Sequence, residues 1–458
     1  MTLLRWLWPG IGVKRWIGLF ALGVLMISLG LALAVGGNVV RALGDWVRNT
    51  AYLLTGSILT PLWRGVLLAL AGCAVIAVAA SGLVRAILKV VFPEMENVGE
   101  LIYQRKYLER GPRVVAIGGG TGLATLLRGL KAYTSNITAI VTVTDDGGSS
   151  GRLRGELGVP PPGDIRNCLC ALADTESLME RLFQHRFAES GSLSGHSFGN
   201  LFIAAMTEVT GDFELAVRQS SRVLAVRGRV LPSTVWDVVL NAEFTDGTTT
   251  RGESAITGAG KFIARLSLDP AEAEPLAESL EAIAAAEVIV LGPGSLYTSV
   301  IPNLLVRDIA DAIAASPALV VYVANLMTEH GETDGYGVAE HVYALHTHAG
   351  RPVIDVVIEN DCPVPAPVLE SYAAERAFPV PVSRGELERQ GLRVVRVSLL
   401  EAGRLARHDP QQLAREIVKL TVGGRTRERV GRYSFMWLAE HLHRRASAAR
   451  KEGTGDRV

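Results

Sequence analysis

The sequence contains little cysteine and has no excess of charge of either sign. It has four cysteines in 458 residues, and lysine plus arginine equal aspartate plus glutamate at 46 each. So few thiols do not make a disulfide framework and suit a reducing compartment. A protein that binds nucleic acid usually has a basic excess, so nucleic acid is not an expected partner.

A zinc-type ligand set is also missing from the sequence pattern. Cys168 and Cys170 form a Cys-x-Cys pair, but a second Cys/His pair does not stand nearby. Structural zinc sites need four such ligands, and catalytic sites need at least three. We therefore interpret the pair as small residues on a buried helix face.

Charged residues are absent from two long N-terminal stretches, residues 16–40 and residues 65–84. About 20 apolar residues cross a bilayer core, so both stretches are long enough. The first run is longer than the hydrophobic region of a typical signal peptide. The alternative is a buried hairpin in a soluble domain. We predict a two-span anchor over residues 1–85, with the lipid bilayer as its partner.

The basic residues that flank these spans set the predicted orientation. Three precede the first span and three follow the second, whereas the connecting loop has three basic residues and Asp45. The positive-inside rule then places both ends in the cytoplasm. We expect a multi-pass protein of the bacterial cell membrane whose main domain is cytoplasmic. The flanking residues are Arg5, Lys14, Arg15, Arg85, Lys89 and Arg105, and the loop residues are Arg41, Arg48 and Arg64.

The remaining chain alternates short apolar runs with helical patterns. We divide it into a juxtamembrane connector (86–111), an α/β domain (112–448) and a disordered tail (449–458). Strands separated by helices predict a Rossmann-like, doubly wound, mostly parallel sheet. The expected strands are residues 113–117, 137–143, 287–291, 318–323, 352–358 and 393–398, and the expected helices are residues 123–132, 178–187, 198–208, 413–420 and 433–446.

The first candidate ligand loop is Gly118-Gly119-Gly120-Thr121-Gly122, between the first strand and its helix. Glycines let an anion approach the backbone, and the free N–H groups of a helix start favour phosphate. A Gly-Lys-Ser/Thr sequence does not follow, so this is not a P-loop. Leu123 stands where a dinucleotide fingerprint has its third glycine, which argues against a nicotinamide-dependent oxidoreductase. The loop predicts a phosphate cradle of another type.

Further polar loops follow later strands and helices: the second covers residues 144–154, the third 161–167, the fourth 195–200 and the fifth 291–299. Successive parallel strands bring such loops to one sheet edge. The carboxylates of Asp145 and Asp146 could bind ribose hydroxyls or a cation such as Mg²⁺, or act in catalysis if the protein is an enzyme. Asp164 is a further ligand-binding candidate, and the alternative is that it caps the helix that follows it. His196 could act as an acid or base, although a partner acid cannot be assigned to it. The other candidates are Ser149, Ser150, Arg152, Asn167, Ser197, Asn200, Gly292, Gly294, Ser295 and Tyr297, whose ring could stack on a base, and a sixth polar loop covers residues 325–335.

The order of these blocks resembles the YvcK/CofD-like family. The blocks are VVAIGGGTGLATLLRGLK, ITAIVTVTDDGGSSGRLR, PPPGDIRN, HSFGNLFIAAM, GPGSLYTSVIPNLL and NLMTEHGETDGY, within about residues 113–340. The DDGGSSGRLR and PGDIRN blocks favour the gluconeogenesis-factor branch over the 2-phospho-L-lactate transferase branch. Typical members begin near the glycine-rich strand, whereas this chain has about 110 further N-terminal residues.

The resemblance implies a Rossmann-like domain that binds a UDP-sugar, UDP-N-acetylglucosamine. It implies a regulatory role that links carbon metabolism to cell-wall precursor synthesis and cell shape. By position, the glycines of the first loop and Tyr297 would contact the ligand. A homo-oligomer and a protein partner in cell-wall precursor synthesis are expected. The alternative is a transferase that moves a phospho-lactyl or phosphoenolpyruvyl group from a nucleotide donor.

Overall fold

The chain folds as two compact units, residues 1–104 and residues 105–458. The computed structural model describes residues 13–35, 61–91, 106–174, 177–188, 191, 193–383, 385–401, 403 and 405–423. The expected helix 433–446, the tail 449–458 and most of the connector 86–111 lie outside the described residues.

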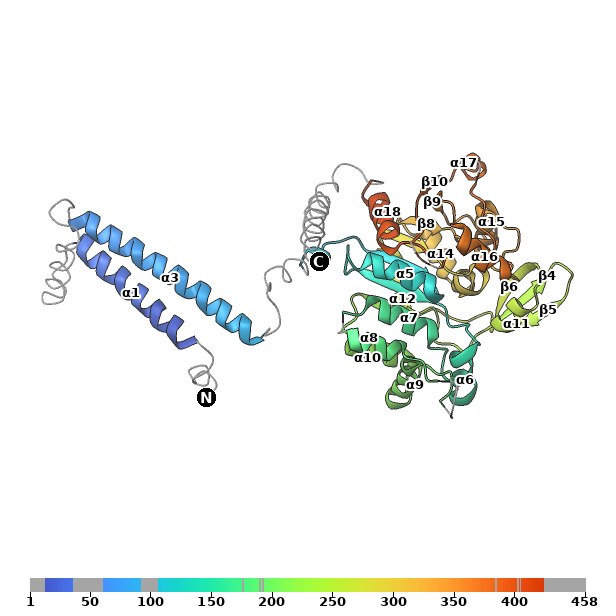
Figure 1. Cartoon of the computed structure of the whole chain (residues 1–458), viewed down its shortest axis with the longest axis horizontal. Coiled ribbons are helices and arrows are strands. Elements are labelled where there is room, and N and C mark those ends of the chain that lie inside the picture. Colours follow the sequence, from blue (N-terminus) through green and yellow to red (C-terminus); the bar gives the residue numbers. More distant parts are fainter. Residues whose placement is uncertain are drawn as a thin grey trace. The chain divides into compact units, whose positions relative to one another are not determined.

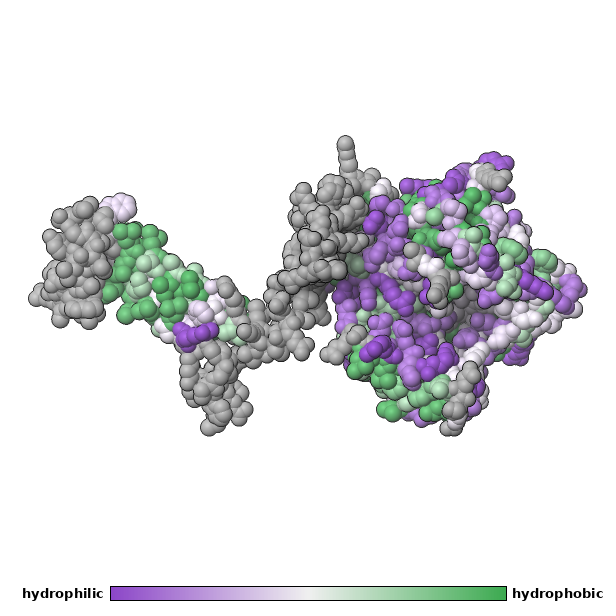
Figure 2. All heavy atoms as spheres, viewed as in Figure 1, coloured by the Kyte–Doolittle hydropathy of each residue, from purple (hydrophilic) through white to green (hydrophobic). Residues whose placement is uncertain are grey.

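The first unit contains two antiparallel helices, α1 (Val13–Val35) and α3 (Pro61–Val91). Glycines let them pack closely: a Cβ on Gly72 would lie 2.8 Å from the Gly23 carbonyl oxygen. Close packing through small residues is how helices associate in lipid. Only 11% of one apolar window and 17% of the other is buried, and Figure 2 shows their apolar outer surface. In a hairpin buried in a soluble domain, most of each apolar window would be buried. Both helices are long enough to span a membrane, and the membrane anchor stays a prediction.

The second unit is built on a seven-stranded sheet in the order β10-β9-β8-β7-β1-β2-β3. All its neighbouring strands are parallel, which confirms the predicted doubly wound fold. The strand order reverses between β1 and β7, and ligands bind at such a switch point beyond the carboxyl ends of the strands. The strands are β1 (Val114–Gly118), β2 (Ile137–Val141), β3 (Arg229–Pro232), β7 (Val288–Leu291), β8 (Leu319–Val323), β9 (Val356–Asn360) and β10 (Arg393–Val397).

Helices cover both faces of this sheet. Along β1, Val114 and Ala116 pack into one core, whereas Val115 and Ile117 pack into the other. On the first face α18 lies beside α5, and α5 lies beside α7 (Figure 1). The helices are α5 (Gly120–Leu130), α6 (Gly148–Leu157), α7 (Gly163–Leu172), α8 (Ser177–Gln184), α9 (Phe198–Thr210), α10 (Phe213–Val223), α12 (Ala277–Ala285), α13 (Ile301–Leu305), α14 (Ile309–Ala315), α15 (Val338–Ala349), α16 (Ala366–Ala374), α17 (Glu386–Arg389) and α18 (Pro410–Gly423), and η3 (Leu296–Val300) is a π-helical turn.

A second, antiparallel sheet was not predicted. It has the order β5-β4-β6 and lies with α11 (Glu253–Gly258) at one end of the domain (Figure 1). Its strands are β4 (Val239–Phe244), β5 (Thr249–Arg251) and β6 (Ile263–Asp269). Buried and exposed positions alternate along β4, so these strands lack the continuous apolar runs that mark the parallel strands.

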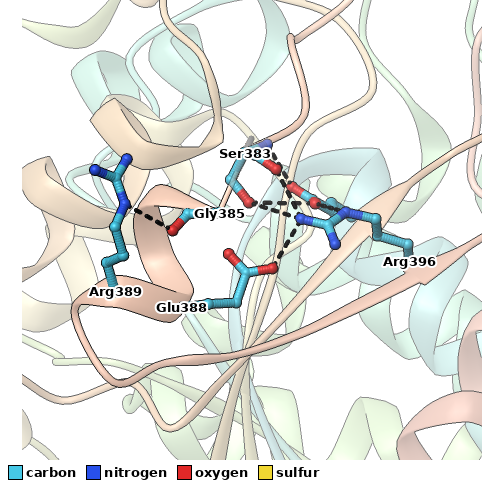
Figure 3. Close-up of polar contacts among 6 residues, drawn as sticks. Ser383, Gly385, Glu388, Arg389 and Arg396 are labelled. Atoms are coloured by element: carbon cyan, nitrogen blue, oxygen red, sulfur yellow. Dashed lines mark hydrogen bonds and ion pairs between the residues drawn. The ribbon is translucent and has the colours of Figure 1, made fainter.

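A buried carboxylate of β9 bonds to Ser383, before β10, and to Arg396 of β10; Figure 3 shows how Ser383, Glu388 and Arg396 lie around this contact. Glu359 is 1% exposed and pairs with Arg396 at 2.7 Å. It also accepts hydrogen bonds from the backbone N–H and the hydroxyl of Ser383. Arg396 in turn donates to the Ser383 carbonyl and to Glu388. The arrangement satisfies the charge that the strand buries.

Replacing the arginine in Arg396→Gln should destabilise the fold by about 1–2 kcal/mol. Glu359 would lose its counter-charge, although the bonds from Ser383 keep the cost below that of a fully orphaned buried ion. The urea midpoint of the full chain measures the change. Arg393→Gln, an exposed arginine of the same strand, is the control and should shift stability by no more than about 0.5 kcal/mol. Equal midpoints for the two variants would contradict the role assigned to the pair.

Candidate functional site

The first glycine loop lies at the switch point, between β1 and α5. Gly120 has a φ of +66°, a left-handed conformation that favours glycine. A Cβ on Gly122 would lie 2.6 Å from the Pro293 carbonyl oxygen, and a Cβ on Gly119 would meet the carboxylate of Asp164. The loop therefore packs directly against the loops at 163 and 293, and only glycine permits that approach.

One interpretation of the sequence made Asp164 the cap of its own helix, α7. The structure shows that it is not the cap. The N-cap of α7 is Pro162, and Asp164 lies in the first turn. Its carboxylate instead accepts a hydrogen bond from the backbone N–H of Gly120, at the start of α5. Burial raises the pKa of Asp164 to about 6, and the charge of Asp145 acts in the same direction. The third loop thus contacts the first through a carboxylate.

The second loop is shorter than expected, because α6 begins at Gly148 and contains Ser149, Ser150 and Arg152. Asp145 accepts from the backbone N–H of Gly147 at 2.9 Å, and Asp146 accepts from that of Ser254 at 2.9 Å. Arg152 donates to the carbonyl of Ser194, the residue before the fourth loop. Within the described residues, no three His, Cys, Asp or Glu side chains are placed to hold a metal ion.

The fourth loop joins the second and third through a buried polar network. Ser149 Oγ lies 3.0 Å from His196 Nδ1, and Asn200 donates to the same hydroxyl. Burial lowers the pKa of His196, which favours the neutral imidazole. Nδ1 accepts from the Ser149 hydroxyl in one neutral tautomer and donates to it in the other. Ser197 caps α9 by accepting a hydrogen bond from the Asn200 N–H.

Arg166, next to the predicted Asn167, connects the same loops. Its guanidinium donates to the hydroxyl of Ser197, to Asn200 Oδ1 at 3.0 Å and to Asn167 Oδ1 at 2.8 Å. The Nε atom of Arg166 is buried and makes no hydrogen bond. All these partners are neutral. The fold therefore holds an arginine at the site without giving it a carboxylate partner.

The structure does not place the ring of Tyr297 opposite the first loop. Tyr297 is 2% exposed, packs in the core, and its hydroxyl lies 2.9 Å from that of Tyr336. Its backbone N–H donates to Glu332. The ring does not offer the predicted stacking surface, because η3 turns it inward. Gly294 does reach the first loop, since a Cβ there would lie 3.2 Å from the Gly119 carbonyl oxygen.

Buried carboxyl groups line the region where the second, third and sixth loops meet. Burial raises the pKa of Glu253 to about 9, and Asp145 and Asp164 raise it further. Burial likewise raises the pKa of Glu332 to about 8, although Thr298 and the Tyr297 N–H donate to it. Both shifts favour the protonated carboxyl over the carboxylate at neutral pH. A protonated carboxyl can both donate to and accept from a hydroxyl-rich ligand.

Two cavities open beside the first loop, each with a volume of about 250 Å³. The first has Gly120, Thr121 and Gly122 on one side and Gly294 and Ser295 on the other. The second shares Thr121, Thr125 and Arg407 with it. The remaining lining of the first is Thr125, Pro293, Ser299, Asn325, Leu326, Met327, Glu329, Ala406, Arg407 and His408, and that of the second is Ala124, Arg128, Arg166, Asn167, Gln184 and Arg186.

The convergence of these loops agrees with a comparison to known families. The family described as 2-phospho-L-lactate transferase CofD matches residues 114–400, the whole sheet with its ligand loops. The chain belongs to this CofD-like family. The family expected from the sequence is thereby confirmed, and relatives of the CofD-like chain carry the name gluconeogenesis factor.

Relatives of this CofD-like chain have two lengths. The gluconeogenesis factor of Bacillus subtilis is 50% identical over 68% of this chain and 98% of its own length. A crystal structure from Bacillus halodurans, with a TM-score of 0.65 and 50% identity, covers 67% of this chain and 99% of that chain. A relative from Nostoc is 48% identical over 420 residues, 91% of this chain and 92% of its own length.

The long match to the Nostoc relative exceeds residues 105–458 and therefore extends into the first unit. The Bacillus relatives match about two thirds of this chain over almost their whole length, whereas the Nostoc relative matches about nine tenths of it. The N-terminal unit of the present chain is thus shared with another CofD-like protein.

Sequence reasoning missed two groups of site residues. Glu253 is the first residue of α11, in a segment where the sequence pattern indicated no helix or strand. The sequence signal for this helix start is an acidic residue that directly follows Gly252. Arg128 lies on α5, and Arg186 follows α8. At such positions arginine usually faces solvent. Only the fold shows that they line one cavity.

Proposed function

We propose that the second unit binds a nucleotide sugar, with UDP-N-acetylglucosamine as the first candidate. The observation that carries the proposal is the cavity at the switch point, where two glycine loops and a helix start face each other. Backbone N–H groups there suit a diphosphate. Hydroxyls of Thr121, Thr125 and Ser299 and the carboxyl of Glu329 supply partners for sugar hydroxyls.

The role that fits this site best is regulation. His196 has a serine neighbour at 3.0 Å but no acidic partner among the described residues, so a triad is not assembled. Asp145 and Asp146 accept hydrogen bonds from nearby backbone, which uses part of their capacity. We propose a regulator, tethered to the membrane by α1 and α3, that links carbon metabolism to cell-wall precursor synthesis and cell shape.

Calorimetry on the full chain tests the ligand. UDP-N-acetylglucosamine should give saturable heat, and UMP together with free N-acetylglucosamine should bind far more weakly, because neither half spans the cavity. The thermal midpoint should rise with ligand concentration, since a ligand that binds only the folded state stabilises it. Neither heat nor a thermal shift at millimolar ligand would rule out the proposal.

The second candidate is a transferase, and the family description favours it. Its substrates would be a guanylated phospho-lactyl or phosphoenolpyruvyl donor and a deazaflavin acceptor, with Mg²⁺ added to the assay. Incubation of the full chain with these compounds should then give product that disappears in Asp146→Asn. Absence of product, together with saturable UDP-sugar binding, would decide for the regulator.

A further inference from the structure

The second cavity is lined by four arginines from separate parts of the chain. Arg128 comes from α5, Arg166 from α7, Arg186 from the segment after α8, and Arg407 from the segment before α18. Asn167 and Gln184 complete the polar wall. Helix packing brings these donors together, although Arg128 and Arg407 are almost 280 residues apart in the sequence.

None of the four arginines pairs with a carboxylate in the part of the chain that the structure describes. Arg186 donates only to the carbonyl of Gly195, and Arg166 donates only to neutral groups. Arginines elsewhere on the domain do have acidic partners, for example Arg227 with Asp174 and Arg351 with Asp311. The cavity therefore concentrates positive charge that the protein itself leaves unbalanced.

Arg166 is held in one position by the protein and is not a mobile surface side chain. Its guanidinium is fixed by three hydrogen bonds, and its Nε is buried without a partner. Burial and the positive charge of Arg186 both lower the pKa of Arg166, whereas Asp164 and Asp145 raise it without bonding to it. Arg128, Arg186 and Arg407 are exposed, so Arg166 is the member of the group whose charge the fold partly buries, and a bound anion would stabilise that charge.

We propose that this arginine cavity binds phosphate groups, and that it communicates with the neighbouring nucleotide-sugar cavity through Thr121, Thr125 and Arg407. The guanidinium groups of Arg128, Arg186 and Arg407 suit an anion with two or more charges, because an arginine can donate parallel hydrogen bonds to oxyanions. Arg166, most of whose hydrogens are used within the protein, adds positive charge. The phosphate is either the diphosphate of the nucleotide sugar or that of a separate small metabolite. The proposed function identifies the neighbouring ligand, but the anion site does not depend on it.

Calorimetry of the full chain with inorganic pyrophosphate tests the anion site directly. The unmodified chain should bind it, and affinity should fall with rising salt. Arg128→Gln combined with Arg186→Gln should weaken binding by roughly 100-fold, since each charge-assisted bond contributes about tenfold or more. Arg407→Gln alone should weaken it by roughly tenfold. Arg181→Gln, an exposed residue of α8 that does not line the cavity, is the matched control and should leave affinity unchanged.

Competition identifies the source of the phosphate. If the diphosphate of the nucleotide occupies the cavity, saturating pyrophosphate should compete with UDP-N-acetylglucosamine, and the double variant should weaken both ligands. If a separate metabolite binds there, both ligands should bind together. Either result supports the site.

The failure of this proposal can be distinguished from failure of the proposed function. No pyrophosphate binding to the unmodified chain, or equal affinity in the double variant, Arg407→Gln and Arg181→Gln, overturns the anion site even if UDP-N-acetylglucosamine binds. Pyrophosphate binding that the arginine variants abolish, without any UDP-N-acetylglucosamine binding, upholds the anion site and overturns the nucleotide-sugar proposal.

Discussion

Gly122→Ala should weaken nucleotide-sugar binding by at least about 100-fold while the domain remains folded. The new Cβ would lie 2.6 Å from the carbonyl oxygen of Pro293, 2.8 Å from its carbonyl carbon and 3.0 Å from the Gly294 N–H nitrogen. All three are backbone atoms, so the first and fifth loops must move apart. Overpacking of this kind costs about 1–3 kcal/mol of stability. The larger effect falls on the ligand, because both loops line the proposed cavity.

A second glycine provides the control for this experiment. Gly155 lies in α6, and a Cβ there would meet nothing within 4 Å. Gly155→Ala should leave binding unchanged and stabilise the helix by roughly 0.5–1 kcal/mol. Calorimetry and thermal unfolding of both variants separate a binding defect from a folding defect. Binding by Gly122→Ala within twofold of the unmodified chain would show that the ligand does not use this contact.

The parallel sheet and the first loop could be predicted because their signals are local. Residues buried on both faces of a parallel strand form continuous apolar runs, such as Val114–Ile117. A glycine run between such a strand and a helix is typical of a loop that binds phosphate. The loops then had to converge, because parallel strands end at the same edge. The structure does bring together the loops at 118, 145, 164, 196, 294 and 325.

The direction of side chains and the charge balance of cavities could not be predicted. Tyr297 follows a glycine loop and was expected to face a ligand, but the π-helical turn directs it into the core. Asp164 stands where a helix cap is common, yet it reaches across to Gly120. Arg128 and Arg407 meet only because α18 packs on α5. These features depend on contacts between distant segments, which a single sequence does not specify.

The stability of the chain should fall between pH 7 and pH 8.5, by on the order of 2–3 kcal/mol. Burial raises the pKa of Glu253 to about 9 and that of Glu332 to about 8, both from an ordinary value of 4.5. In this range the folded state therefore holds protons that the unfolded state has already lost. The unfolding free energy changes with pH in proportion to the number of protons bound by the unfolded state minus the number bound by the folded state. Here that difference is negative, so stability decreases as pH rises.

Buried histidines do not obscure this decrease. Burial lowers the pKa of His408 to about 4 and also lowers that of His341. Such groups make stability rise with pH, but only up to their unfolded value near 6.5. Above pH 7 they are neutral in both states. The carboxyl groups therefore dominate the range that the experiment covers.

Urea unfolding of the full chain at pH 7 and pH 8.5 measures the effect, and Glu253→Gln isolates the larger part of it. A neutral amide at this position cannot ionise, so the variant should lose more than half of the difference between the two pH values. Glu243→Gln, an exposed residue of β4, should keep the whole difference. Stability that is constant or rises over this range would mean that Glu253 and Glu332 are ionised in the folded protein, and the region beside the glycine loop would then favour a cation over a sugar hydroxyl.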